Sequence, residues 1–149
     1  MRQLSLGYRA NNPMDVTSDP TTLKNDPWVG QVGVVYSSDS SHCFAVFDSV
    51  ANGVRCGAHV VLGYQKNDGI NTLQGLVDRF APSSDNNPSD YAAELADYVG
   101  RGKDESISFD EYLETICRGI VQREQSLDLV TDAEYTAGIQ SARSAFGLA

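Results

Sequence analysis

Glu124 lies at the end of an apolar segment, where a carboxyl group could do acid chemistry. The apolar residues of this segment recur at steps of three and four, as on one face of a helix. They are Phe109, Leu113, Ile116, Cys117 and Ile120. At about 100° per residue, Glu124 projects roughly 20° from Leu113. The sequence therefore predicts a carboxyl group on the core-facing side of the last helical turn.

Such a carboxyl group would tend to keep its proton. Partial burial disfavours the ionised form, and the negative end of the helix dipole acts in the same direction. A neutral carboxylic acid is what a glycosidase or lytic transglycosylase needs to protonate a glycosidic oxygen. The alternative is a Glu124 head group that reaches back to solvent, where charged groups usually lie. Spacing alone leaves both interpretations open.

Further polar and aromatic residues gather in or beside the expected connections between elements. Amides next to aromatic rings suit sugars, because a sugar presents hydroxyl groups and one apolar face. The competing explanation is that Asn and Asp are simply turn formers. Asp85 is also a candidate second carboxylate, which a lytic transglycosylase would not need. The candidate binding residues are Asn11, Asn12, Trp28, Tyr64, Asp85, Asn86 and Tyr91.

The cysteine and histidine pattern predicts neither a metal site nor a cofactor. Cys56 and His59 have the spacing of a zinc-finger half, but no matching pair follows. A nucleophilic Cys–His pair is a further alternative, although packing explains each thiol better. The three cysteines, Cys43, Cys56 and Cys117, cannot all pair, and we expect free thiols in a reducing compartment.

The composition indicates one compact globular domain over residues 1–149 and excludes several classes of partner. The chain is 41% hydrophobic and carries a net charge of −9. This charge argues against non-specific binding of nucleic acid and against docking on an anionic membrane. An acidic protein can still bind an uncharged or mixed-charge glycan. No apolar run is long enough for a signal peptide or a membrane span.

The elements expected around Glu124 make a mainly α (α+β) fold with one small β-hairpin. Residues 1–30 are rich in turn formers and predict an ordered loop, with Trp28 pinning it to the body. The last helix should begin at the capping box of Thr131 and Glu134. The expected hairpin strands are 31–36 and 43–47, and the expected helices begin near residues 48, 72, 87, 108 and 131, the last ending near 146.

Several segments, in this order, resemble a family of small phage proteins described as virion structural proteins or lysozyme-like lysins. The resemblance covers roughly residues 7–125. The order of the matching segments is quite specific, although each segment alone is weak evidence for the family. The segments are Arg9-Ala-Asn-Asn-Pro13, Trp28-Val-Gly30, Phe44-Ala-Val-Phe-Asp-Ser49, Gly53-Val-Arg55, Gly69-Ile-Asn-Thr72, Arg79-Phe-Ala-Pro82 with Asp85, Asn86 and Tyr91, and Gln122-Arg-Glu124.

The first segments also resemble glucosaminidases of the lysozyme-like fold. In those proteins an Asn-rich turn, a Trp-x-Gly and a small hairpin follow the helix that bears the catalytic Glu. Here that helix would come last, giving a circularly permuted lysozyme core. The resemblance implies a muramidase (an endolysin or a virion-associated lysin) that cleaves the MurNAc–GlcNAc bond of peptidoglycan. It also implies that Glu124 is the acid.

The sequence departs from the family at the end of the key helix. The family usually ends Arg-His-Glu-Asn-Gly, whereas this chain has Gln122-Arg123-Glu124-Gln125-Ser126, and Phe80 replaces a family Trp. Arg123 could lower the pKa of Glu124, although adjacent helical residues do not face each other. The helix expected at 131–146 has no counterpart in the family.

These departures support an alternative, a non-catalytic virion or tail protein that keeps the lysozyme-like fold. Exposed apolar surface on the 131–146 helix would favour it. The expected partners are the peptidoglycan glycan strand and possibly other virion subunits. We expect synthesis in the host cytoplasm without a signal peptide, and action at the cell wall or as part of the virion.

Overall fold

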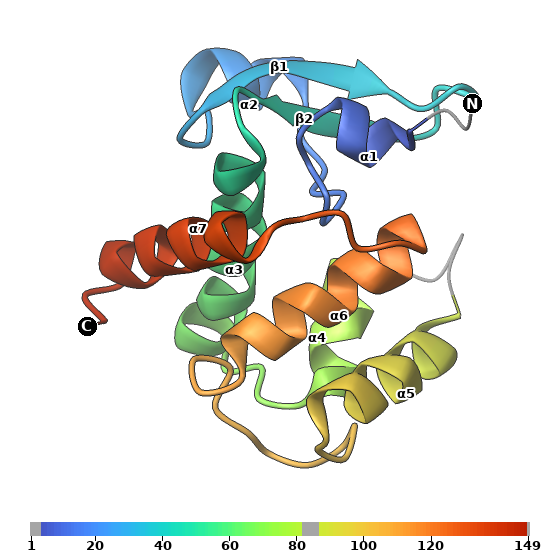
Figure 1. Cartoon of the computed structure of the whole chain (residues 1–149), viewed down its shortest axis with the longest axis vertical. Helices are drawn as coiled ribbons and strands as arrows, with labels where there is room; N and C mark the ends of the chain where they lie inside the picture. Colours follow the sequence, from blue (N-terminus) through green and yellow to red (C-terminus); the bar gives the residue numbers. More distant parts are fainter. Residues whose placement is uncertain (1–3, 82–86, 149) are drawn as a thin grey trace.

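The computed structural model describes residues 4–81 and 87–148, and it is mainly helical with a small two-stranded sheet, as predicted (Figure 1). The candidate residues Asp85 and Asn86 lie outside the described residues. The elements in chain order are α1 (Leu6–Arg9), α2 (Pro20–Asn25), β1 (Gln31–Tyr36), β2 (Cys43–Phe47), α3 (Val50–Asp68), α4 (Leu73–Phe80), α5 (Pro88–Val99), α6 (Leu113–Gln125) and α7 (Asp132–Ala145).

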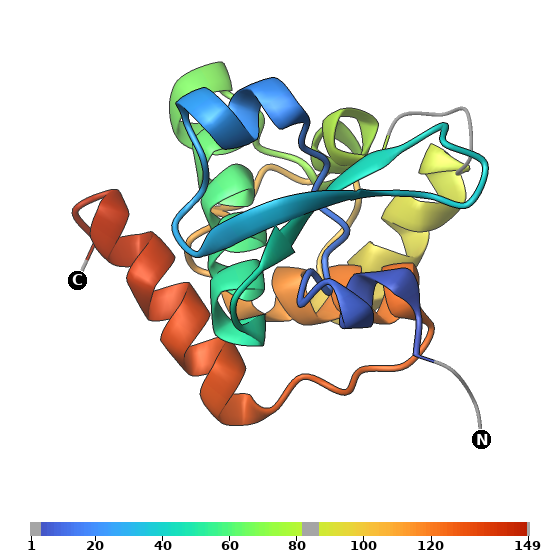
Figure 2. The ribbon, with the colours of Figure 1, turned by 90° about the horizontal axis from the view of Figure 1, so that it is seen from above.

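The hairpin, α1 and α2 lie at one end of the molecule, and α4 and α5 lie at the other (Figure 1). The strands β1 and β2 pair antiparallel, with Tyr36 opposite Cys43. Seen from above, the hairpin crosses over the helices (Figure 2). Ala45 and Phe47 of β2 are buried, so one face of the hairpin closes the core.

The long helix α3 is the central element of the helical part. It packs against α7, α6 and β2, while α5 packs between α4 and α6. The side chains that these contacts bury form one hydrophobic cluster, which includes Val54, Val61, Leu76 and Ile116. In the part of the chain that is described, no helix has the length and apolar character needed to cross a membrane.

Helix α6 begins later than the apolar pattern predicts. A helix was expected to begin near residue 108, and Ser108 Oγ does accept the Glu111 N–H at 3.2 Å, but residues 109–112 form turns before the helix. The reason is Gln65 of α3. Its side chain donates to the Ile107 carbonyl and accepts the Phe109 N–H, both at 2.8 Å, which holds this segment against α3. Phe109 therefore enters the core without being helical.

Residues 4–30 include two short helices, so the prediction of a loop throughout this segment was wrong. They contain α1, whose N-cap is Ser5, and α2, whose N-cap is Asp19. Both helices are too short to show apolar periodicity, although Asp19 followed by Pro20 is a typical helix start. Trp28 packs edge-on against His59, with ring centroids 5.2 Å apart, and so attaches the segment to α3 as expected.

Helix α7 begins at the predicted capping box of Thr131 and Glu134. Its buried residues include Tyr135 and Ile139, and it packs along α3. Among the described residues, the large apolar side chains that are strongly exposed lie outside α7. They are Leu4, Val29, Val32, Tyr36, Tyr98, Leu127 and Leu129. Exposed large apolar side chains on α7 would have favoured a non-catalytic virion protein, and the described residues of this helix show none.

Gly53 allows the N-terminal loop to lie directly on α3, and its replacement should destabilise the fold. A Cβ at Gly53 would lie 2.0 Å from the Asn11 carbonyl oxygen, whereas a Cβ at Gly63 would meet nothing closer than 3.7 Å. We expect Gly53→Ala to cost about 2–3 kcal/mol through backbone displacement. Gly63→Ala should instead gain roughly 0.5–1 kcal/mol from helix propensity. Urea unfolding of both variants checks this, and equal effects would contradict the close contact.

Candidate active site

Two carboxyl groups from distant parts of the chain meet at the end of α6. Glu124, in the last turn of α6, shares a hydrogen bond with Asp15 of the N-terminal loop. Both side chains are partly buried. The core-facing position predicted for Glu124 is thus observed. Asp15 was missed, because nothing in its local sequence distinguishes it from a turn residue.

Helix α5 supplies a third group to the pair. The Tyr91 hydroxyl donates to Glu124 Oε2 at 2.7 Å, and the Tyr91 side chain is fully buried. Tyr91 can reach Glu124 because α5 and α6 pack along each other. Glu124 is therefore held by hydrogen bonds to both Tyr91 and Asp15.

The turn that presents Asp15 is held by the two asparagines predicted to bind sugar. Asn12 is fully buried; its amide donates to the Val16 and Ala45 carbonyls at 2.9 Å and its carbonyl accepts the Val16 N–H at 3.0 Å. Asn11 donates to the Phe47 carbonyl at 3.0 Å. Asn11 and Asp15 both have positive φ, near 54° and 53°. In this structure both asparagine side chains shape the turn.

The environment keeps a proton on the carboxyl pair. Burial and the Glu124 carboxyl raise the pKa of Asp15 to about 8, against an opposing hydrogen bond from Gln125. Burial also raises the pKa of Glu124, while hydrogen bonds from Tyr91 and Asp15 oppose this shift. Two carboxyl groups in contact titrate as a unit. A hydrogen bond between two carboxyl groups needs a proton on one of them, and burial raises the pKa of both, so the pair favours a retained proton.

Arg123 is directed away from its neighbour Glu124. It forms an ion pair with Glu94 at 2.7 Å, and its guanidinium lies 5.0 Å from the centre of the Tyr91 ring. The charge of Arg123 does lower the pKa of Glu124, but it is the weakest of the influences and burial outweighs it. The effect considered from the sequence is present and does not decide the protonation state.

The remaining candidate residues are engaged in contacts of their own. Trp28 packs against His59, and Tyr64 lies under the Arg79 guanidinium at 5.2 Å. Burial raises the pKa of the Cys56 and Cys117 thiols, so these groups are packing residues rather than nucleophiles. Within the described ranges, no three His, Cys, Asp or Glu side chains are grouped as a metal site would require.

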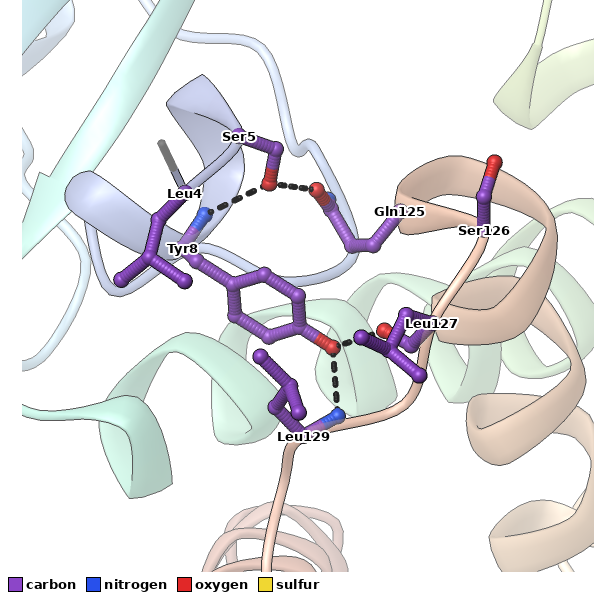
Figure 3. Close-up of a pocket in the computed structure, with 7 residues that line it drawn as sticks. All are labelled: Leu4, Ser5, Tyr8, Gln125, Ser126, Leu127 and Leu129. Atoms are coloured by element: carbon purple, nitrogen blue, oxygen red, sulfur yellow. Dashed lines mark hydrogen bonds between the residues drawn. The ribbon is translucent and has the colours of Figure 1, made fainter. Parts of the chain in front are cut away.

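A cavity of about 330 Å³ is lined in part by Gln125, the residue that follows Glu124 (Figure 3). The Tyr8 hydroxyl connects two other lining residues, because it donates to the Leu127 carbonyl and accepts the Leu129 N–H at 2.7 Å. Glu124 and Asp15 are not part of the lining, which consists of Leu4, Ser5, Tyr8, Gln125, Ser126, Leu127 and Leu129.

Comparison with known proteins associates this chain with a phage protein. No family model matches the sequence. The chain is similar to Protein P5 of Pseudoalteromonas phage PM2, with 21% identity over 140 residues that cover 94% of this chain and 83% of that protein. The similarity supports the phage association expected from the sequence. It carries no information about a lysozyme-like domain or about peptidoglycan.

Proposed function

We propose that this protein is a phage muramidase of the lytic transglycosylase type, with a lysozyme-like fold, that cleaves the glycan strand of peptidoglycan. Glu124 is the group that protonates the leaving oxygen. The observation that carries the proposal is the contact between Glu124 and Asp15, because burial raises the pKa of both carboxyl groups and so favours a retained proton. The resemblance of the α6 segment to lysin helices that end in a Glu supports the same residue.

The contact between the two carboxyl groups favours transglycosylation over hydrolysis. Hydrolytic glycosidases keep their carboxyl groups about 5–9.5 Å apart, so that a sugar or a water fits between them. Asp15 and Glu124 are instead hydrogen-bonded to each other. Asp15 cannot then act on the opposite face of a sugar that Glu124 protonates. A single-acid reaction, which needs no second catalytic carboxylate, fits this arrangement.

One reaction cycle would leave the protonation of the Asp15–Glu124 carboxyl pair unchanged. The proton of the pair, passed from Asp15 to Glu124, moves to the glycosidic oxygen as the bond from this oxygen to C1 of MurNAc breaks. The 6-hydroxyl oxygen of the same MurNAc then bonds to C1, and its proton returns to the carboxylate pair. The products are a shortened strand and a 1,6-anhydro end. No water is consumed.

A second candidate is a non-catalytic virion protein that uses the same fold to bind the cell wall or other virion subunits. The similarity to a phage protein over nearly the whole chain is compatible with this candidate. The exposed leucines around the cavity, Leu4, Leu127 and Leu129, would then contact a partner. In that case the carboxyl pair only connects the N-terminal loop to α6.

A peptidoglycan digestion separates these candidates. Purified, folded protein is incubated with purified peptidoglycan, clearing is followed in a zymogram, and the released muropeptides are analysed by mass spectrometry. We expect clearing with 1,6-anhydro products. Reducing ends without anhydro sugars would mean hydrolysis and would contradict the single-acid reaction. No release from folded protein would favour the virion candidate.

A further inference from the structure

Gln125, the residue that follows Glu124, connects three separate parts of the site. We propose that Gln125 is a positioning residue that holds the Asp15 carboxyl against Glu124. A catalytic role for Gln125 rests on the proposed function. Its effect on the position of the Asp15 side chain does not depend on any activity.

The contacts of Gln125 come from both ends of its amide group. Its nitrogen donates to Asp15 Oδ1 at 3.0 Å and to the Pro13 carbonyl at 2.9 Å. Its oxygen accepts the hydroxyl of Ser5, the residue that caps α1 (Figure 3). One side chain therefore binds the turn on both sides of residue 14 and also the start of α1. With these bonds in place the Asp15 carboxyl has little freedom to turn away from Glu124.

Gly7 shows that α1 is fitted closely to this arrangement. A Cβ at Gly7 would lie 2.3 Å from the Gln125 amide nitrogen and 2.5 Å from Asp15 Oδ1. Any larger residue would thus enter the space that the Gln125–Asp15 hydrogen bond occupies. The absence of a side chain at Gly7 lets α1 cover this bond, which shields it from competing water.

The direction of the Asp15 titration distinguishes positioning from a simple hydrogen bond. The Gln125 bond by itself lowers the pKa of Asp15, while burial and Glu124 raise it. If Asp15 stayed in place without Gln125, its pKa would rise. If Asp15 moved away into water, its pKa would fall toward the ordinary value near 3.9. The other titratable or charged groups that act on the pair are Tyr8, Tyr91 and Arg123.

The experiment is a carboxyl-carbon NMR titration of Asp15 and Glu124 in the full chain. Gln125→Ala is compared with wild type and with Gln122→Ala, which removes an exposed glutamine of the same helix. We expect the pKa of Asp15 to fall by at least about one unit in Gln125→Ala. No fall is expected in Gln122→Ala. An unchanged or raised pKa in folded Gln125→Ala would overturn the positioning role.

Gly7→Ala provides a second route to the same result if Gln125→Ala does not fold. The added methyl group displaces the Gln125–Asp15 bond from the α1 side, and the pKa of Asp15 should fall as well.

Where the protein cleaves peptidoglycan, kcat of Gln125→Ala should fall about 10- to 100-fold with little change in KM. A fall in the pKa of Asp15 in a protein without activity would support the positioning role and refute the proposed function.

Discussion

Replacing Glu124 by Gln is expected to lower the rate of peptidoglycan cleavage by about 100-fold to 10,000-fold, the usual contribution of a general acid. The amide has nearly the same shape as the carboxyl group. Its oxygen can accept the Tyr91 hydroxyl, and its nitrogen can donate to Asp15, so the variant should fold. It cannot deliver a proton to a glycosidic oxygen. The measurement is the initial rate of muropeptide release at saturating peptidoglycan.

The matched control is Glu114→Gln, which neutralises a carboxylate at the start of the same helix. Glu114 is exposed and pairs with Arg118 at 3.3 Å, away from the carboxyl pair. Its replacement should leave the rate within about two-fold of wild type, because exposed ion pairs contribute little. Equal rates for wild type and Glu124→Gln would remove Glu124 from the reaction, whatever the activity of the protein.

Replacing Asp15 by Asn is expected to make the protein more stable at alkaline pH. The folded-state pKa of Asp15 is raised to about 8, whereas an unfolded aspartate titrates near 3.9. The folded protein therefore holds a proton that the unfolded chain releases, and the wild type loses stability as the pH rises from about 4 to 8. The asparagine side chain of the variant has no such proton to lose. It can still accept from Gln125, donate to Glu124 and adopt the positive φ.

The expected gain for Asp15→Asn is about 1 kcal/mol or more at pH 8–9, and close to zero at pH 4. Urea unfolding at several pH values measures it. Asp97→Asn, on the exposed side of α5, serves as the control that removes a carboxylate outside the pair. A variant that is less stable than wild type at pH 9 would show that the two carboxyl groups do not share a proton.

The regular elements of this fold could be predicted because their signals are local. The strands of the hairpin were predicted at their observed bounds, and the caps Thr72, Asn87 and Thr131 lie where Ser, Thr and Asn side chains preceded apolar segments. The start of α6 was misplaced, because the two hydrogen bonds of Gln65 to residues 107 and 109 come from a helix far earlier in the chain.

Only one of the two carboxyl residues of the candidate site could be predicted from the sequence. Glu124 was found because helical spacing gives the direction of a side chain relative to the core. Asp15 depends on the fold of the whole N-terminal loop, including the positive φ of residue 15 and the buried Asn12 amide. An amide in an Asn-rich turn has the same sequence signal whether it binds a sugar or its own backbone. Only the fold shows that the Asn12 amide donates to backbone carbonyls.

The separation in sequence between Asp15 and Glu124 has a consequence for the biosynthesis of the protein. A ribosome must translate nearly the whole chain, and release the α6 segment, before the acid centre can exist. Contacts between such distant residues also form late in folding, since closing a long loop is entropically costly. Under the proposed function, nascent or prematurely terminated chains that lack α6 would lack the acid residue Glu124.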